Sequence, residues 1–434
     1  MARLRLFTAN GLAVALVAAS IVASAAGQQP ASATSAIVQD KVIAGSAKDF
    51  MVVRHVVLKG SNEEIGRALA SIAKERFQSQ PIPSESPLRT RVQRRYIKEH
   101  DPILFDRMRG VAAAFGRSID DDKLNFSSLM YLFGSAPGCS VMHIPPSMTV
   151  DGNGVVSRDY DFTTGTLYGT RPAKGQLPCT ARPYLIEVHP DRGYPSLAMY
   201  SYDLLSGVLD GINSEGLTVA LLADDELMNK FQMEPAGMDG VGLGVLQVQR
   251  MLLDTCANID EAKETLLLTK QYYEIVPVHY LIADRHGKAF VWEFSQAHNK
   301  EHIIENGDKP LITTNFSLNR HLTKGKVPSS EATKTLCPRY CALADRLFEK
   351  PVKVTLDAIK ETHKLADITM TPKDPNRPPT RTLWHALYVP AQRKVQISFY
   401  LRDERNGDEP SKPRIVRSEY LEFVLKAEKS AAAQ

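Results

Sequence analysis

The chain has 434 residues, of which 43% are hydrophobic and 24% are charged, and this composition is typical of a globular protein with one large domain or two ordinary ones. The formal net charge is +4 at pH 7, and removing the two charges of Arg3 and Arg5 leaves +2. So small an excess does not favour an acidic surface or a nucleic acid as a partner, and we expect no nucleic-acid binding.

The first 26 residues have the pattern of a secretory signal peptide. Arg3 and Arg5 give a basic start, residues 12–26 are apolar, and Ala23-Ser24-Ala25 fits a small-residue cleavage site. We therefore predict a secreted or periplasmic protein, with no stable membrane insertion once residues 1–26 are removed. The alternative is an uncleaved membrane anchor, because residues 6–26 are just long enough to span a bilayer. Residues 27–47, rich in Ala, Ser and Gln, are predicted to be a flexible leader.

Residues 48–138 are predicted to be mainly helical. Residues 51–58 alternate weakly and suggest a first strand. A helix is then predicted from Ser61, because apolar residues recur at helical spacing, at Ile65, Leu69, Ile72 and Phe77. Residues 92–97 and 104–115 continue the helical pattern.

From residue 139 onward the pattern changes to strands joined in hairpins. Strands are predicted at 139–144 and 155–162, on either side of a turn at 151–154. Further hairpins are predicted at 208–221, 278–294 and 383–400, and helices at 245–256, 258–268 and 340–348. Sheets built from hairpins, with helices between them, predict an α+β fold for residues 139–434, in four layers: helix, sheet, sheet, helix.

Cys139 has the surroundings of an N-terminal nucleophile. It follows Gly138 at the head of a predicted strand, and Arg158 and Asp161 stand on the next strand. Cutting the Gly138–Cys139 bond would free an α-amine, and its pKa of about 7.7–8.0 is close to the thiol's value of about 8.5. The amine could therefore accept the thiol proton without a histidine. The alternative is an ordinary buried cysteine, because free cysteines are among the most buried residues.

The other cysteines and the glycine-rich stretches carry no clear chemistry. Five cysteines in an exported protein leave one without a disulfide partner, and Cys139 is the candidate. The other four either pair or stay reduced: Cys179, Cys256, Cys337 and Cys341. No Cys-x-x-Cys spacing is present, and His298 and His302 stand in a charged stretch, so we expect no metal site. The glycines within 237–244 lack the residues of a phosphate-binding loop, and we expect no cofactor.

Taken in order, short motifs along the chain resemble those of the N-terminal-nucleophile cysteine amide hydrolases. The resemblance is to the branch of isopenicillin N acyltransferase, which is related to the bile salt hydrolases. It covers most of residues 50–400 and rests on the order of motifs that are individually weak: Glu64-Ile65-Gly66, Gly138-Cys139-Ser140, Arg158-Asp159-Tyr160-Asp161, Gly211-Ile212-Asn213-Ser214-Glu215-Gly216-Leu217, Asp284 to Gly287 with Glu293, Thr313-Thr314-Asn315 and Pro338-Arg339-Tyr340. It implies the family's αββα sandwich with a helical N-terminal segment.

The resemblance implies a role for five side chains. After a cut at Gly138–Cys139, Cys139 would be the nucleophile and, through its α-amine, the base. Arg158 would favour the ionised thiol, and Asp161 would hold the amine. Asn315 would bond the amine or the tetrahedral intermediate, and Arg339 would support the carboxylates. Without the family, Arg158 and Asp161 would be interpreted as an ion pair at a strand end, Asn315 as a turn former and Arg339 as a helix cap.

Two features depart from the family pattern. Bile salt hydrolases carry an asparagine just after the Gly-Leu strand as an oxyanion donor, whereas this chain has Asp224 and Asp225 there. An ionised carboxylate cannot donate a hydrogen bond. Arg158 and Asp161 are three residues apart, so a regular strand would point them to opposite faces, and we expect a bulge or a strand end between them.

These observations predict an exported, self-cleaving enzyme that attacks linear, non-peptide amides and forms a thioester. The acyl group would pass to water or to an amine. The expected partner is a small N-acyl compound, such as an acylated amino acid, amine or β-lactam side chain, and the two chains made by the cut would form a heterodimer. The alternatives are an exported binding protein on the same scaffold and a Cys-His protease using His143 or His385.

Overall fold

The computed structural model describes most of the chain beyond its first 35 residues: 36–131, 138–165, 174, 177–178, 180–230 (without the side chains of 229 and 230), 240–274, 276–295, 300–348, 353–374, 376–407 and 413–426. Internal contacts divide the chain into units 1–32 and 33–434, and all described residues belong to the second. The predicted signal peptide, residues 1–26, lies outside the described residues. None of the helices described is both long and apolar enough to cross a membrane.

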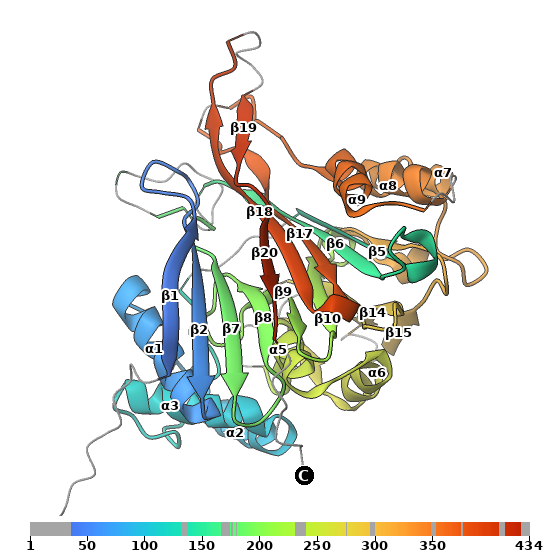
Figure 1. Ribbon diagram of the computed structural model, residues 1–434. Helices are drawn as coiled ribbons and strands as arrows, with labels where there is room; N and C mark the ends of the chain where they lie inside the picture. Colours follow the sequence, from blue (N-terminus) through green and yellow to red (C-terminus); the bar gives the residue numbers. More distant parts are fainter. Residues whose placement is uncertain are drawn as a thin grey trace, which may run out of the picture. The chain divides into compact units, whose positions relative to one another are not determined.

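Two large β-sheets make up the centre of the described residues (Figure 1). The nine-stranded sheet has the order β1 (Ile37–Ala44), β2 (Val53–Gly60), β7 (Tyr184–Pro190), β8 (Ser196–Tyr200), β9 (Val208–Asn213), β10 (Thr218–Ala223), β13 (Val278–Ala283), β14 (Ala289–Ser295) and β15 (Lys300–Ile304). The seven-stranded sheet has the order β16 (Leu311–Thr313), β5 (Gly138–Ile144), β6 (Val155–Thr163), β17 (Thr380–Val389), β18 (Lys394–Glu404) and β19 (Arg414–Arg417), and β20 (Leu421–Val424) also pairs with β18.

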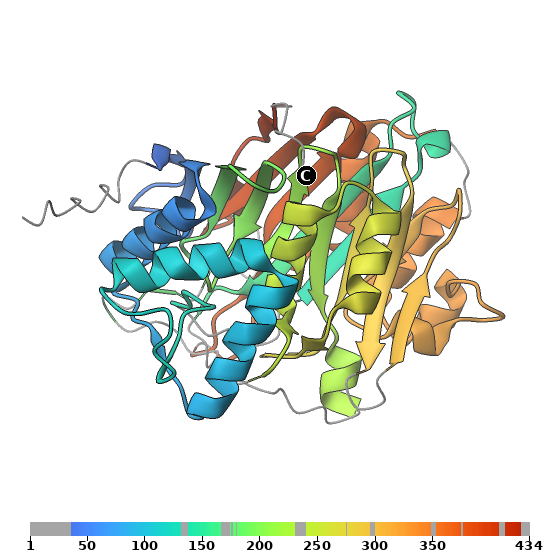
Figure 2. The same cartoon turned by 90° about the horizontal axis from the view of Figure 1, so that it is seen from below.

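Helices cover the outer face of each sheet. The nine-stranded sheet is covered by α1 (Asn62–Phe77), α2 (Pro87–His100), α3 (Pro102–Ala114), α5 (Val245–Thr255) and α6 (Ile259–Leu268), which lie in front of it in Figure 2. The helices α8 (Pro338–Phe348) and α9 (Leu356–His363) lie against β16 and β6 of the other sheet. Shorter helices are α4 (Asp225–Lys230) and α7 (Ser330–Thr333), with 3-10 turns at Pro146–Met148, Leu318–His321, Lys364–Ala366 and Pro390–Gln392. Two-residue strands pair as β3 (Ile82–Pro83) with β4 (Leu124–Asn125) and as β11 (Leu243–Gly244) with β12 (Gln271–Tyr272).

The inner faces of the two sheets pack on each other. β5 contacts β10 across the interface, and the buried guanidinium of Arg158 on β6 donates to the carbonyl of Leu221 on β10 at 2.9 Å. The predicted four-layer α+β fold is therefore confirmed. The helix predicted from Ser61 is also present, because Ser61 and Glu64 form a capping box at the start of α1.

The structure corrects the expected boundaries before Cys139. Residues 27–47 were expected to be a flexible leader, but Ile37–Ala44 form β1, which pairs with β2 along its length. The side chains of β1 are mostly half-buried or exposed, but Ile37 and Ile43 pack against the core and Ala44 is buried within it, and the pairing with β2 and the ion pair between Arg54 and Asp40 at 2.7 Å add to this contact. Within residues 48–138 the strand expected at 51–58 is present as β2, and the helices α1, α2 and α3 follow it; what the sequence did not indicate is that β2 pairs in parallel with β7 from the later part of the chain.

Candidate active site

Cys139 lies near the start of β5, with its thiol fully buried. β5 pairs with β6 without a register shift, so Gly138 is opposite Asp161, Cys139 is opposite Tyr160, and Val141 is opposite Arg158. Directly opposed residues of an antiparallel pair point to the same face. The thiol therefore shares the inner face of the sheet with Tyr160 and Arg158.

Arg158 is fixed by a partner that the sequence did not reveal. Its Nε donates to Asp210 Oδ1 at 3.4 Å, and both side chains are fully buried. Asp210, on β9, also accepts hydrogen bonds from Tyr388 Oη at 2.6 Å and Trp384 Nε1 at 3.2 Å. The only sequence signal for Asp210 is a charged residue between apolar neighbours in a strand, Leu209-Asp210-Gly211. This carboxylate balances the guanidinium charge beside the thiol.

Two opposing effects act on the pKa of the Cys139 thiol. Burial raises the pKa of the Cys139 thiol above its usual value. The positive charge of Arg158 and its hydrogen bond to the thiol oppose that rise. The ionisation of this buried thiol therefore depends on neighbouring guanidinium groups, chiefly that of Arg158 and to a smaller extent that of Arg339.

Asn315 and Arg339 hold both backbone polar groups of Cys139. The Cys139 N–H donates to Asn315 Oδ1 at 2.7 Å, and Arg339 Nη1 donates to the Cys139 carbonyl at 2.8 Å. Arg339 also donates to Asn315 Oδ1 at 2.6 Å through Nη2. Asn315 is oriented by its own amide, which donates to the carbonyl of Ala223 at 2.8 Å. The nitrogen that a cut would free thus already faces a side-chain acceptor.

Asp161 approaches the same junction from the opposite face of β6. Its carboxylate accepts from Arg339 Nη1 at 3.0 Å and from the Thr382 hydroxyl at 2.5 Å. A Cβ atom on Gly138 would lie only 3.1 Å from the Cβ of Asp161 and 3.0 Å from Ile368, so the close approach favours glycine. Burial raises the pKa of Asp161, and Arg339 is the largest opposing influence.

The bulge expected in β6 between Arg158 and Asp161 is not there. β6 is regular from Val155 to Thr163, and the extra residue lies on β17 between Thr382 and Trp384. Arg158 and Asp161 therefore stay on opposite faces, as strand geometry requires. Both are still linked to residue 139, because Arg158 meets the thiol directly, while Asp161 acts through Arg339, which donates to the Cys139 carbonyl.

The two aspartates after β10 have different roles. Asp224 accepts from Leu227 N at 2.9 Å and from the Ser317 hydroxyl at 2.6 Å, so it starts α4 and holds the segment after Asn315. The Asp225 N–H donates to the Asn315 carbonyl at 3.1 Å. Burial raises the pKa of Asp225 to about 6, against the positive charge of Arg339. Asp225 is therefore the aspartate that shares an electrostatic environment with the site.

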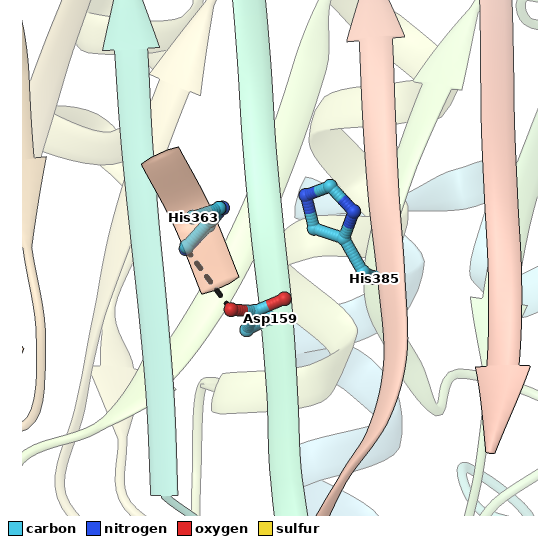
Figure 3. A group of neighbouring side chains, drawn as sticks. All are labelled: Asp159, His363 and His385. Carbon is cyan, nitrogen blue, oxygen red and sulfur yellow. Dashed lines mark ion pairs between the residues drawn. The ribbon is translucent and has the colours of Figure 1, made fainter. Parts of the chain in front are cut away.

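Behind the site, Asp159, His363 and His385 form a compact buried group on the helix-facing side of the sheet (Figure 3). Asp159 on β6 is opposite Ser140 on β5 and His385 on β17, and His363 comes from the end of α9. One ligand-type atom from each of the three side chains lies within 4.8 Å of the others. Sequence reasoning expected no metal site and did not single out Asp159 or His363, which only the strand register and the packing of α9 bring together.

The histidines of this group are already hydrogen-bonded to protein side chains. The Ser157 hydroxyl lies 2.6 Å from His363 Nδ1 and 2.8 Å from His385 Nε2. His363 Nε2 contacts Ser140 Oγ at 3.0 Å, and His385 Nδ1 contacts Tyr420 Oη at 2.5 Å. Burial lowers the pKa of His363 to about 3 and that of His385 well below its usual value, so both rings are neutral.

The structure also shows the state of the other cysteines and of the two histidines considered for a Cys-His protease. Cys139, Cys256, Cys337 and Cys341 are free thiols, and Cys179 lies outside the described residues. His385 is engaged with Ser157 and Tyr420, and burial lowers the pKa of His143 to about 4. Neither arrangement gives Cys139 a hydrogen-bonded imidazole base among the described residues.

Comparison with known proteins supplies the last observation. The model of the acyl-coenzyme A:6-aminopenicillanic acid acyl-transferase family matches residues 149–403. No curated protein matches the chain. Similar solved structures include a conjugated bile acid hydrolase from Clostridium perfringens, at 14% identity and a TM-score of 0.40, covering 68% of this chain and 99% of that one. Penicillin V acylase from Agrobacterium tumefaciens has 13% identity and a TM-score of 0.36, covering 66% and 80%. A Caenorhabditis elegans N-acylethanolamine-hydrolyzing acid amidase ortholog has 16% identity and a TM-score of 0.35, covering 58% and 93%.

Proposed function

The chain belongs to the acyl-coenzyme A:6-aminopenicillanic acid acyl-transferase family, whose model matches more than half of it, and from this premise we propose that it is an exported enzyme that cuts its own Gly138–Cys139 bond. As an N-terminal-nucleophile cysteine enzyme, it would then act on linear N-acyl amides. One observation carries the proposal: the Cys139 nitrogen, carbonyl and thiol each have a dedicated polar partner, in Asn315, Arg339 and Arg158.

The self-cut requires only groups that surround Cys139. The thiol sulfur attacks the carbonyl carbon of Gly138, the C–N bond breaks, and the thiol proton passes to the departing nitrogen. Water then hydrolyses the thioester, which leaves a carboxylate on Gly138 and returns the thiol. The hydrogen bond from Arg339 to the Cys139 carbonyl and that from Cys139 N–H to Asn315 would hold the junction in place during this change.

Turnover would repeat the same chemistry on a substrate amide. The freed α-amine takes the thiol proton, the sulfur attacks the acyl carbon, and the departing amine receives that proton. Water attacks the resulting thioester, the acid is released, and the thiol is restored. Asn315 and Asp161 flank the position of the amine, and Arg158 favours the ionised sulfur.

The cellular setting favours water as the acyl acceptor. The predicted signal peptide would export the protein from the compartment that contains acyl-coenzyme A. An N-acyl amino compound is the substrate class, such as an acylated amino acid, amine or β-lactam side chain. This choice rests on the family and on the absence, among the described residues, of a histidine paired with the thiol.

Intact-mass and N-terminal analysis of purified protein tests the proposal. We expect active material to consist of two polypeptides, the second beginning at Cys139, and a panel of N-acyl amides to be hydrolysed. Cys139→Ala should stay a single polypeptide without activity, whereas His143→Gln should be cut as the wild type is. Full activity with the Gly138–Cys139 bond intact would refute the mechanism. One uncut polypeptide that binds amides without turnover would instead favour a binding protein on this scaffold.

A further inference from the structure

A cavity of about 560 Å³ opens beside the predicted cleavage junction. Gly138 and Phe162, at the ends of β5 and β6, form one part of its lining. The segment between α9 and β17 forms the rest, and contributes Met370, Lys373 and Arg377. Its volume is within the range of about 300–1,000 Å³ that is usual for small-molecule sites.

The position of Gly138 identifies which part of a substrate this cavity would receive. In the self-cut the Gly138 carbonyl is the acyl group and the Cys139 nitrogen is the leaving group. A substrate's acyl carbonyl must reach the same sulfur, so its acyl chain extends to the Gly138 side. The assignment rests on the proposed function, because the cavity receives the acyl group only if Cys139 is the nucleophile that attacks the substrate amide.

The segment that lines the cavity is anchored by a buried arginine. Arg381, on β17, pairs with Asp403 at 2.7 Å and is almost fully buried. The same guanidinium donates to the Met370 carbonyl at 2.8 Å and to the Thr371 hydroxyl at 3.0 Å. Thr380 N also donates to the Met370 carbonyl, at 2.9 Å, which closes the base of the segment. The two ends of the segment are therefore held together at the sheet.

The charged side chains of the segment between α9 and β17 are unbalanced. Lys373 and Arg377 are exposed and form no ion pair with any carboxylate of the described residues. The carboxylate of Asp374, which also lines the cavity, accepts from Asn376 N at 2.9 Å. Two cations therefore face one anion at the rim of a cavity whose inner wall includes the buried ring of Phe162. Such a lining fits a ligand with an apolar body and a negatively charged end.

We propose that the acyl group of the substrate carries a carboxylate at the end remote from the amide, and that Lys373 and Arg377 recognise it. The substrates would be monoamides of dicarboxylic acids, with the methylene chain against Phe162 and Met370. Exposed ion pairs are individually weak, so the two cations together should favour the carboxylate by about fivefold to tenfold.

A matched substrate series tests this assignment on the two-chain enzyme. Each pair has the same amine and the same acyl chain length, from four to eight carbons, and ends in either a carboxylate or a methyl group. We expect kcat/KM to be about fivefold to tenfold higher for the acid at one chain length or more, mainly through a lower KM. Added salt should reduce the preference, because it screens exposed charges.

Variants separate recognition from catalysis. Lys373→Gln and Arg377→Gln together should abolish the preference for the acid, so that the acid-ended and methyl-ended members of each pair have similar kcat/KM. Lys326→Gln, which removes an exposed charge from another loop, should keep the preference. Equal rates for both members of every pair in the wild type would overturn the proposal, as would a preference that survives the double variant.

A binding measurement distinguishes this failure from failure of the proposed function. In the Cys139→Ala chain, which cannot cut or turn over, calorimetry should show tighter binding of dicarboxylic monoamides than of the matching alkanamides. If no amide is hydrolysed but this difference is found, the cavity assignment holds and the enzymatic proposal fails. If neutral amides are hydrolysed and no difference is found, only the cavity assignment fails.

Discussion

The two faces of β6 bury charged groups in opposite ways. On the inner face, Arg158 meets Asp210, and that carboxylate is further bonded by Tyr388 and Trp384. On the helix-facing side, Asp159 lies 3.4 Å from the neutral ring of His363 (Figure 3) and close to two further carboxyl groups, those of Asp161 and Asp367. On one face of β6, the charge of Arg158 is balanced by the hydrogen-bonded carboxylate of Asp210. On the other face, the ionisation of Asp159 and Asp161 depends on neighbouring groups.

The difference indicates how one strand can serve a buried thiol and a buried amine at once. A paired cation keeps its charge at all ordinary pH values, which suits a group that favours thiolate. Burial together with Asp367 and Asp161 raises the pKa of Asp159 well above its usual value, which favours its protonated form. A protonated Asp159 leaves Asp161 as the carboxylate beside Arg339 and Gly138.

Arg158→Met should have the largest effect, because it breaks the inner face. Asp210 would be left buried without its cation, which typically costs about 3–5 kcal/mol of unfolding free energy. The thiol would also lose its only adjacent positive charge on that face, and we expect self-cutting to slow at least about 100-fold. Denaturant unfolding and the rate of fragment appearance on denaturing gels measure the two effects.

Arg107→Met is the matched control, because Arg107 and Asp254 form another fully buried pair, at 2.6 Å, away from the site. It should reduce stability but leave the cutting rate of the folded protein unchanged. If both variants slow the cut equally, Arg158 acts through stability alone.

A pair of conservative changes sharpens the contrast within the helix-facing side. Asp161→Asn should slow self-cutting about 100-fold, because Arg339, which donates to the Cys139 carbonyl, loses the carboxylate that holds it there. Asp159→Asn should stay within about threefold of the wild type, since an amide resembles a carboxyl that burial already keeps neutral. The cutting rate of freshly refolded precursor distinguishes them. A large loss in Asp159→Asn would show that this carboxyl is ionised when the chain is cut.

The helix-facing side should contribute to the pH dependence of stability. Burial raises the pKa of Asp367 to about 6, compared with about 3.9 in an unfolded chain. The folded state therefore retains a proton that the unfolded state has lost, and stability falls as pH rises from about 4 to about 6. Asp367→Asn removes this fall, so it should be more stable than the wild type at pH 7 by about 1–3 kcal/mol and no more stable below pH 4.

Urea midpoints measured from pH 3.5 to 7.5 test the expectation for Asp367. Asp357→Asn, at an exposed position on α9, should follow the wild-type curve throughout. A constant offset between Asp367→Asn and the wild type at all pH values would contradict the assigned pKa.

Ser157→Ala should give the smallest effect. The hydroxyl bridges two neutral imidazoles, and removing it leaves each ring nitrogen with one partner fewer. We expect a loss of about 1–2 kcal/mol in unfolding free energy with little change in cutting rate. Thermal unfolding and a time course of cutting measure both. A cutting rate that falls with stability unchanged would place this hydroxyl in the reaction itself.

The sequence predicted local features well and cross-strand partners poorly. Hairpins and capped helices could be predicted because their patterns are local. The ordered motifs singled out five residues that the structure places close together: Cys139, Arg158, Asp161, Asn315 and Arg339. The catalytic roles of these residues stay predictions. Thr382 and Asp210 were missed, because strand register and sheet packing set their contacts with Asp161 and Arg158. β1 was missed because its sequence has no clear alternation of apolar and polar residues and its order comes largely from pairing with β2.

The parallel pairing of β2 with β7 would decide how a chain cut at Gly138–Cys139 behaves. β2 precedes the cleavage junction and β7 follows it, and seven residue pairs join them. A nick at Gly138 would therefore create new chain ends without releasing a piece, and only denaturant would separate the two polypeptides. Renaturation would then require two molecules to find each other, so it would depend on protein concentration, whereas the precursor folds as one. A matured enzyme unfolded at high dilution would not recover, and its working lifetime would be set by how slowly it opens.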